Sequence, residues 1–140
     1  MSNFNDVGKF HSKFGLPSVD DLGHLAGPTG AETNKELMDF RITLIQEELD
    51  EFRQGVQDCN IVDIADALID LAYVVFGAAH TLGLPWQALW DDVQEANMRK
   101  VRAASDGSDS KRGSGFDVVK PEGWQGPQTE EILRAFGFKI

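Results

Sequence analysis

The sequence is poor in cysteine and in positive charge. Cys59 is the only cysteine in 140 residues, which excludes an intrachain disulfide and a zinc site of several cysteines, and fits a reducing cytoplasm. We interpret this cysteine as a small, partly buried residue. The 13 Lys and Arg stand against 23 Asp and Glu, which gives a formal net charge of −10. This charge argues against binding of a nucleic acid polymer, whereas a free nucleotide bound through a metal ion remains compatible with it.

Targeting signals and long apolar runs are also absent. Residues 1–6 lack the basic and apolar regions of a signal peptide, and no apolar run is long enough to span a bilayer. We therefore expect a soluble, cytoplasmic protein without a membrane partner. A length of 140 residues suits one domain with a real core, so we predict a single domain over residues 1–140.

Helical periodicity dominates the apolar pattern and predicts an all-α fold of four to five helices. Asn60 is a good N-cap for the third helix, and Gly55 and Gly83 are expected to end the second and third. The third helix is nearly all apolar in its second half, so we expect it to be central and buried around most of its circumference. The expected helices cover about 5–14, 33–55, 60–82, 85–101 and 128–136.

Two stretches are expected to be loops. Glycine and proline are dense over residues 16–31, which is atypical of regular structure. Residues 103–117 are polar and rich in glycine and serine, which predicts a flexible loop.

Two acidic clusters interrupt the second and third helices. Their sequences are EELDE from position 47 and DIADALID from position 63. Glu48 and Glu51 share one helix face, and so do Asp66 and Asp70, because residues three and four apart are neighbours on a helix. Carboxylates beside core residues repel one another and lose hydration unless a cation lies between them. Mg²⁺ and Mn²⁺ prefer such ligands and also hold phosphates, so the pattern predicts metal-assisted chemistry on a phosphorylated molecule.

These clusters belong to a longer ordered pattern. They are followed by LAYVVFG from position 71, NMRK from position 97 and KPEGW from position 120. Over residues 37–133 the chain thereby resembles the MazG-like all-α nucleoside triphosphate pyrophosphohydrolases, a superfamily with dimeric dUTPases and phosphoribosyl-ATP pyrophosphohydrolases. The resemblance implies a helical bundle that forms a homodimer or homotetramer. It also implies Mg²⁺- or Mn²⁺-dependent cleavage between the α and β phosphates, which releases a nucleoside monophosphate and pyrophosphate.

The resemblance also implies the roles of the acidic residues. Two or more metal ions are expected, because a triphosphate adds its own negative charges to an acidic site. Glu47, at the edge of the cluster, is expected to act as general base toward water. The family's usual glutamate three residues before Asp70 is replaced by Ala67, and Asp66 still lies beside Asp70 at helical spacing. The expected metal ligands are Glu47, Glu48, Glu51, Asp66 and Asp70.

Cationic and polar residues complete the predicted site. Arg41 lies two turns before the first cluster on the same helix face, where it can pair with acids or with phosphate. Arg99 and Lys100 are expected to stabilise charge on phosphate oxygens, and Asn97 is expected to hydrogen-bond sugar or phosphate. Lys120 is expected to reach the bound substrate on the mobile segment. Trp124 is equally suited to stacking on a base and to pinning the tail. The candidate substrate-binding residues are Arg41, Asn97, Arg99, Lys100, Lys120 and Trp124.

The sequence leaves the substrate and one other class of function open. The resembling group includes dUTP-directed enzymes and phage-encoded members that act on (d)GTP, so dGTP, GTP and dUTP are the substrates considered. Phosphoribosyl-ATP ranks lower, because the chain has the long loop and the KPEGW tail of the dNTP-directed branch. The alternative class is a non-catalytic helical interaction or regulatory dimer, in which the acids are only a solvated helix face.

Overall fold

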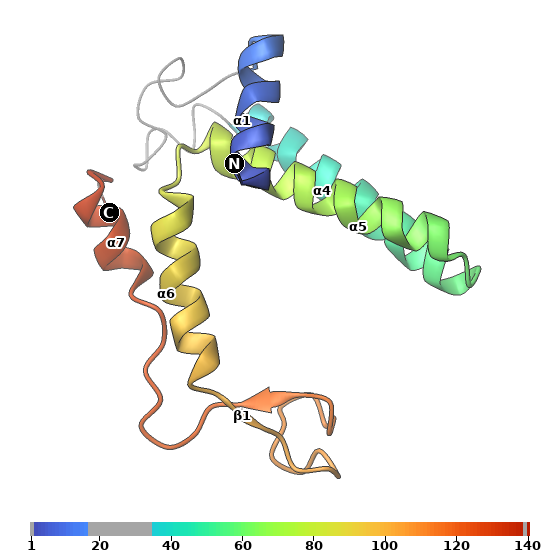
Figure 1. Cartoon of the computed structure of the whole chain (residues 1–140), viewed down its shortest axis with the longest axis vertical. Helices are drawn as coiled ribbons and strands as arrows, with labels where there is room; N and C mark the ends of the chain where they lie inside the picture. Colours follow the sequence, from blue (N-terminus) through green and yellow to red (C-terminus); the bar gives the residue numbers. More distant parts are fainter. Residues whose placement is uncertain (1, 17–34, 139) are drawn as a thin grey trace. The chain divides into compact units, whose positions relative to one another are not determined.

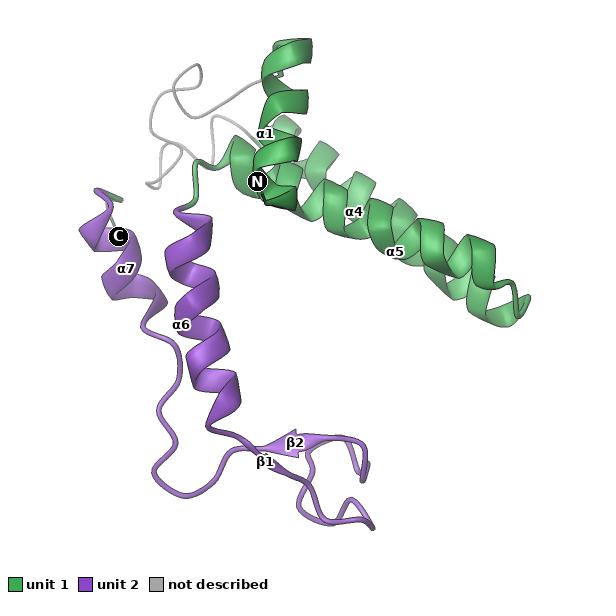
Figure 2. Ribbon diagram, in the orientation of Figure 1, with its two compact units in different colours: residues 1–84, 138–140 green, residues 85–137 purple. Residues whose placement is uncertain are grey.

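The computed structural model describes residues 2–16, 35–138 and 140 (Figure 1). The part of the chain so described holds five helices and one pair of two-residue strands, which confirms the predicted all-α class. The elements group into two compact units, the first from residues 1–84 and 138–140 and the second from residues 85–137 (Figure 2). Each unit is described by itself below.

Helix α1 spans Asn3–Phe14 and confirms the first expected helix. The Ser2 side chain caps its N-terminus by accepting from the Asn5 amide, and Gly15 ends it in the left-handed conformation, with φ of 59°. The helix packs against α5 within the first unit. The expected loop over residues 16–31 and the start of the second helix at residue 33 fall almost wholly outside the described residues.

Helices α4 (Lys35–Gln57) and α5 (Ile61–Thr81) form an antiparallel pair joined by three residues. As expected, Asn60 caps α5, accepting from the Val62 amide at 3.0 Å, and Gly83 follows its end with φ of 61°. The expectation that Gly55 ends α4 was wrong, because the helix continues past it. A Cβ at Gly55 would lie 3.0 Å from the Ile64 backbone nitrogen, so this glycine lets the two helices meet.

The apolar surface of α5 is largely open in the single chain. Of its residues, only Ala67, Gly77, Ala79 and Thr81 are buried. Five large hydrophobic side chains on the same helix are exposed, with accessible fractions from 37% to 73%: Ile61, Val62, Leu68, Ile69 and Tyr73. The expectation that this helix is buried around most of its circumference is therefore wrong for one chain alone. Cys59, just before α5, is also exposed rather than partly buried.

The second unit joins two helices through a strand hairpin. Helix α6 spans Trp86–Met98, strands β1 and β2 span Val101–Arg102 and Val118–Val119, and helix α7 spans Thr129–Ala135. The strands pair antiparallel, with residue 101 opposite 119 and residue 102 opposite 118. Helix α7 confirms the expected closing helix and packs on α6. The expectation that the fourth helix continues to residue 101 was wrong, because β1 begins there.

None of the described helices combines the length and apolar character that a bilayer crossing requires.

Candidate functional site

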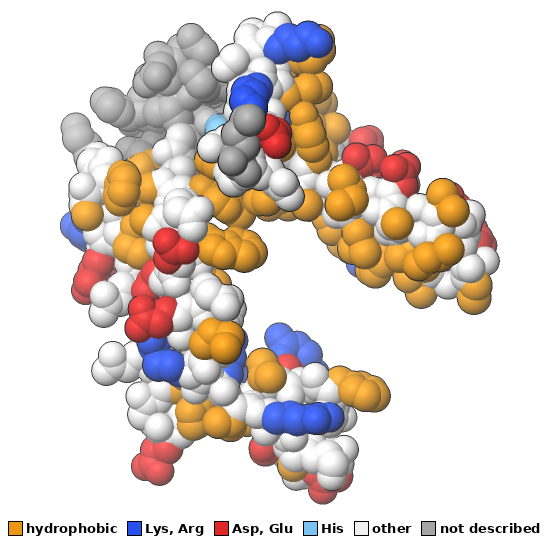
Figure 3. Space-filling view, in the orientation of Figure 1, with side chains coloured by type: hydrophobic (Ala, Val, Ile, Leu, Met, Phe, Trp, Pro, Cys, Tyr) orange, Lys and Arg blue, Asp and Glu red, His pale blue; other side chains and the backbone are white. Residues whose placement is uncertain are grey.

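The five expected metal ligands lie on α4 and α5, where red side chains gather in Figure 3. Glu48 is half-buried, and its Oε2 atom is buried without a hydrogen-bond partner among the described residues. Burial raises the pKa of the Glu48 carboxyl above its ordinary value, and the negative charges of Glu51, Asp70, Glu47 and Asp66 raise it further, in that order. Acids from both helices therefore lie within electrostatic range of one buried oxygen.

The donor set suits a hard divalent cation. A buried carboxylate oxygen without a donor is costly, and a cation would relieve both this cost and the repulsion among the neighbouring acids. Carboxylates are the ligands that Mg²⁺ and Mn²⁺ prefer. Within the described ranges, however, no three His, Cys, Asp or Glu side chains converge closely enough to hold an ion as they stand. The raised pKa of Glu48 and the lack of three converging ligands are compatible, because a pKa responds to charges well beyond the length of a metal bond.

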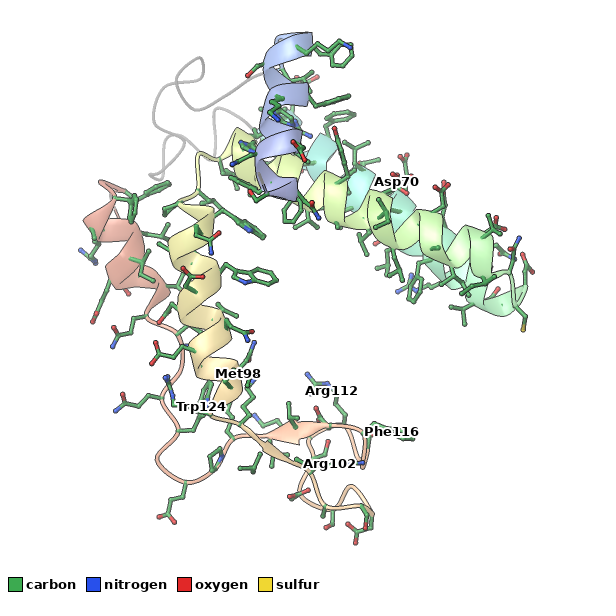
Figure 4. All side chains as sticks on the ribbon, viewed as in Figure 1. Asp70, Met98, Arg102, Arg112, Phe116 and Trp124 are labelled. Carbon is green, nitrogen blue, oxygen red and sulfur yellow. The ribbon has the colours of Figure 1, made fainter. Side chains whose placement is uncertain are left out.

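The departure at Ala67 has a structural consequence. Ala67 is buried, with 2% of its surface accessible, whereas the neighbouring Asp66 is exposed. A glutamate at position 67 would therefore start from the interior face of the helix pair. Of the four acids that raise the Glu48 pKa, Asp66 has the smallest effect, so it lies at the margin of the cluster. Asp70 has a larger effect and projects from α5 in Figure 4.

Arg41 is buried against α1, with 8% of its surface accessible. A Cβ on Gly77 would lie 3.0 Å from Arg41 Nη1 and 3.1 Å from His11 Nε2, so the bare glycine makes room for both side chains. The Nε atom of Arg41 has no hydrogen-bond partner among the described residues, and no acid there forms an ion pair with it. Burial lowers the Arg41 pKa. Burial, then the charges of Arg41 and His80, lower the His11 pKa.

Histidine attaches α1 to α5 rather than forming a zinc site among the described residues. The His80 ring stacks on Phe4 with centroids 3.9 Å apart, and its Nε2 donates to the Phe4 carbonyl at 2.7 Å. The His11 ring lies 5.7 Å from that of His80. His24 lies outside the described residues.

In the second unit, Trp124 gathers two of the expected phosphate-binding lysines. Its indole Nε1 donates to the Ala96 carbonyl at 2.8 Å, which pins the tail to α6. Lys120 Nζ lies 4.5 Å from the Trp124 ring centroid and Lys100 Nζ lies 5.6 Å from it, both within cation–π range. Lys100 also donates to Asn97 Oδ1 at 2.7 Å. Of the two roles considered for Trp124, these contacts favour pinning.

The remaining cations of the second unit differ from expectation. Arg99 pairs with Glu95 at 2.7 Å and donates to the Gln125 carbonyl at 3.3 Å, so its charge is already compensated. Lys111 and Arg112, which sequence reasoning left in a featureless loop, line a pocket together with Lys100 and Lys120. The only sequence signal for them was two adjacent cations within a glycine- and serine-rich stretch.

Known proteins resemble this chain over its helical part. A sequence model of the phosphoribosyl-ATP pyrophosphohydrolase family matches residues 22–97, more than half of the chain, and includes all five carboxylates. An uncharacterized protein, L479 of Acanthamoeba polyphaga mimivirus, is 31% identical over 83 residues, which are 59% of this chain and 32% of that protein. The chain thus spans about a third of the length of this curated relative. The strand hairpin follows the segment matched by the family model.

Proposed function

The chain belongs to the phosphoribosyl-ATP pyrophosphohydrolase family, a family of nucleotide pyrophosphohydrolases, and from this premise we propose that it hydrolyses (d)NTPs with Mg²⁺ or Mn²⁺. Cleavage between the α and β phosphates would release a (d)NMP and pyrophosphate. The observation that carries the proposal is the half-buried Glu48, whose unpartnered Oε2 lies within electrostatic range of four further carboxylates on two helices.

The acids would hold the metal ions and prepare the nucleophile. The metal-binding set is Glu47, Glu48, Glu51, Asp66 and Asp70. Two or more ions bound there would supply positive charge to the phosphates and acidify a water molecule. Glu47 is exposed at the edge of the cluster, where it would accept the proton that water loses on attacking phosphorus. The bond from that phosphorus to the α–β bridging oxygen breaks, and the proton ends on the Glu47 carboxylate.

The cations of the second unit would bind the phosphates. Lys100 and Lys120 have no acidic partner among the described residues, so their charge is available to a ligand. Asn97 orients the Lys100 ammonium. Arg99 is held by its own ion pair and would contribute less. Arg41, buried beside His11, would act on the phosphates only through its unpaired Nε or by orienting α4.

We further propose a homodimer or homotetramer. Exposed apolar side chains on α4 and α5, such as Ile42, Ile61 and Ile69, have accessible fractions of 63% to 73%. A soluble protein rarely leaves such a surface unpartnered. Light scattering should give a mass at least twice that of one chain, and a folded monomer at micromolar concentration would contradict this part of the proposal.

The direct test is a panel of single nucleotides with Mg²⁺ or Mn²⁺, including dGTP, GTP, dUTP and phosphoribosyl-ATP. The expected products are pyrophosphate and a nucleoside monophosphate. Release of orthophosphate would overturn the proposal. Phosphoribosyl-ATP ranks lower than (d)NTPs, although the matching family is named after it, because the hairpin and tail lie beyond the matched residues.

The other candidate is a non-catalytic helical dimer, which the exposed apolar face of α5 also favours. It predicts no hydrolysis of any nucleotide in the panel and no change of melting temperature on addition of Mg²⁺ or Mn²⁺. A metal-dependent rise in melting temperature that is lost in Glu48→Gln would exclude it.

A further inference from the structure

The strand hairpin of the second unit borders an open cavity of about 370 Å³. Four cations and two acids line it: Lys100, Lys111, Arg112, Lys120, Asp109 and Asp117. In a chain with a net charge of −10, this gathering of cations is a local exception. These residues lie beyond the segment matched by the family model.

The two acids of the cavity are occupied by structural contacts. Asp117 accepts from Ser110 Oγ at 2.7 Å, from Arg112 Nη1 at 2.9 and 3.1 Å, and from the Val118 amide at 2.8 Å. These hydrogen bonds, that from Ser110 first, hold the Asp117 pKa below its ordinary value. Asp109 accepts from the Ala104 amide at 2.8 Å. Both carboxylates therefore fix the loop.

The cations, in contrast, keep donors free. Lys111 has no hydrogen bond or ion pair within the described residues, and both bonds of Arg112 to Asp117 use Nη1, which leaves Nη2 and Nε. Lys100 donates only to a neutral amide, and Lys120 lies over the Trp124 ring. Four cations against two carboxylates leave the lining of the cavity with a net positive charge, which favours binding of an anion.

Two close backbone approaches shape the loop that borders the cavity. A Cβ at Gly107 would lie 2.5 Å from the Ser114 nitrogen, and one at Gly115 would collide with the Ser105 carbonyl oxygen. These approaches allow no side chain, so the two glycines bring opposite sides of the loop into contact. Lys111 and Arg112 lie between them in sequence, and Arg112 projects from the hairpin in Figure 4.

We propose that this hairpin cavity binds a diphosphate group, either free pyrophosphate or the β and γ phosphates of a nucleotide. A phosphoryl group carries about 1.5 to 2 negative charges at pH 7 and several acceptor oxygens, which match the unpaired ammonium and guanidinium donors. The volume is at the small end of the range for ligand sites, which suits the phosphates rather than a whole nucleotide. The proposal rests on the proposed function only for the identity of the anion.

The assignment adds Lys111 and Arg112 to the groups that contact the ligand and makes Trp124 a positioning residue. Trp124 holds the Lys100 and Lys120 ammonium groups at 5.6 and 4.5 Å from its ring, while its indole N–H is fixed to α6. The diphosphate would then be held from both sides of the hairpin, by lysines near the Trp124 ring and by cations of the loop.

The test is calorimetric titration of the full chain with inorganic pyrophosphate in EDTA, so that no divalent metal contributes. Lys111→Ala should weaken binding about tenfold. Arg102→Ala is the matched control, because it removes one exposed positive charge from the same hairpin without lining the cavity, and should change the affinity less than twofold. Lys111→Arg should restore most of the binding.

Three outcomes would overturn the proposal. They are no detectable binding of pyrophosphate by the wild-type chain, equal losses in Lys111→Ala and Arg102→Ala, or tighter binding of a single-stranded oligonucleotide than of pyrophosphate. Glu48→Gln separates this proposal from the proposed function, because it should abolish hydrolysis yet leave pyrophosphate binding in EDTA unchanged. If the wild-type chain binds pyrophosphate but hydrolyses no nucleotide, only the proposed function is contradicted. If it hydrolyses nucleotides but does not bind pyrophosphate in EDTA, only the assignment of the cavity is contradicted.

Discussion

The two hairpins of this chain, one of helices and one of strands, carry opposite charge and are built in different ways. Residues 35–81 hold ten acids and three bases, whereas residues 99–120 hold six bases and three acids. The helical hairpin is specified by a periodic apolar pattern, and burial, followed by repulsion from the neighbouring carboxylates, raises the pKa of Glu48. The strand hairpin has little apolar pattern and is fixed by turns and side-chain hydrogen bonds. Each hairpin thus concentrates charge of one sign.

The largest effect on activity is expected from the loss of a carboxylate of the helical hairpin. Glu48→Gln keeps the volume of the side chain and removes its charge, so we expect kcat/KM for the preferred nucleotide to fall at least about a hundredfold. Steady-state release of pyrophosphate at limiting Mg²⁺ measures the loss. Near-normal turnover in this variant would exclude Glu48 as a metal ligand.

Asp50→Asn is the matched control for that variant. Asp50 lies in the same acidic cluster but pairs with Arg53 at 2.7 Å and accepts from Gln46 at 2.9 Å, and it does not contribute to the raised Glu48 pKa. Its activity should stay within about twofold of the wild type, because an exposed ion pair contributes little. An equal loss in both variants would mean that the overall negative charge matters rather than one ligand.

The strand hairpin can be disrupted without touching the helical one. In Gly107→Ala the new Cβ would collide with backbone at 2.5 Å and require a φ of 71°, so we expect hydrogen exchange over residues 103–117 to become much faster. Gly113→Ala is the control, because its φ is 64° but no atom lies within 4 Å. It should show only the smaller cost of the backbone strain, roughly 1 kcal/mol. Equal exchange in the two variants would mean that the close approach does not hold the loop.

The sequence predicted the helical hairpin well because its determinants are local and periodic. Asn60 caps α5 as expected. Burial and then the charges of four acids raise the Glu48 pKa, whereas the role of these acids as metal ligands stays a prediction. What failed there depends on contacts between helices. Gly55 was interpreted as a helix end, but it serves the close approach to Ile64, and the exposed face of α5 is a property of the single chain that no periodicity reveals.

The strand hairpin was not predicted, because glycine and serine occur both in flexible segments and in turns where they make specific contacts. Over residues 103–117 they were interpreted as a sign of flexibility, and that mobility remains an untested prediction. The structure gives several of them specific roles, such as the Ser110 hydroxyl that donates to Asp117 and the bare Gly115 beside Ser105. Such pairings join residues several positions apart without a repeat, so nothing in the sequence pattern indicates them or places Lys111 in a cavity.

A smaller effect is expected from one cation of the second unit. Lys120→Ala removes an ammonium that lies over the Trp124 ring and lines the cavity, so we expect KM for the nucleotide to rise about tenfold while the melting temperature changes little. Arg134→Ala serves as control, because Arg134 pairs with Glu130 on α7 at 2.6 Å, and its KM should be unchanged. A fall in kcat with constant KM would place Lys120 in the chemical step instead of in binding.

The smallest effect concerns pH and should be confined to the first unit, since all three histidines lie within residues 1–84. The ordinary pKa of His11 is 6.5, and in the folded chain burial, Arg41 and His80 lower it. The unfolded chain therefore binds more protons between the two pKa values, and the free energy of unfolding rises with pH across that window. The stabilisation is complete above about pH 6.5 and is lost as the pH falls through the folded pKa.

Thermal unfolding followed between pH 5 and 7.5 measures this dependence. The measurement should be made on the Glu48→Gln variant. The raised pKa of Glu48 acts with the opposite sign, because protonation of that carboxyl favours the folded state, and the substitution removes this contribution. His11→Gln in the same background should flatten the rise of melting temperature with pH, whereas pyrophosphate binding by the second unit should be unaffected by the substitution. An unchanged pH profile after loss of His11 would mean that docking of α1 beside Arg41 does not depend on a neutral imidazole.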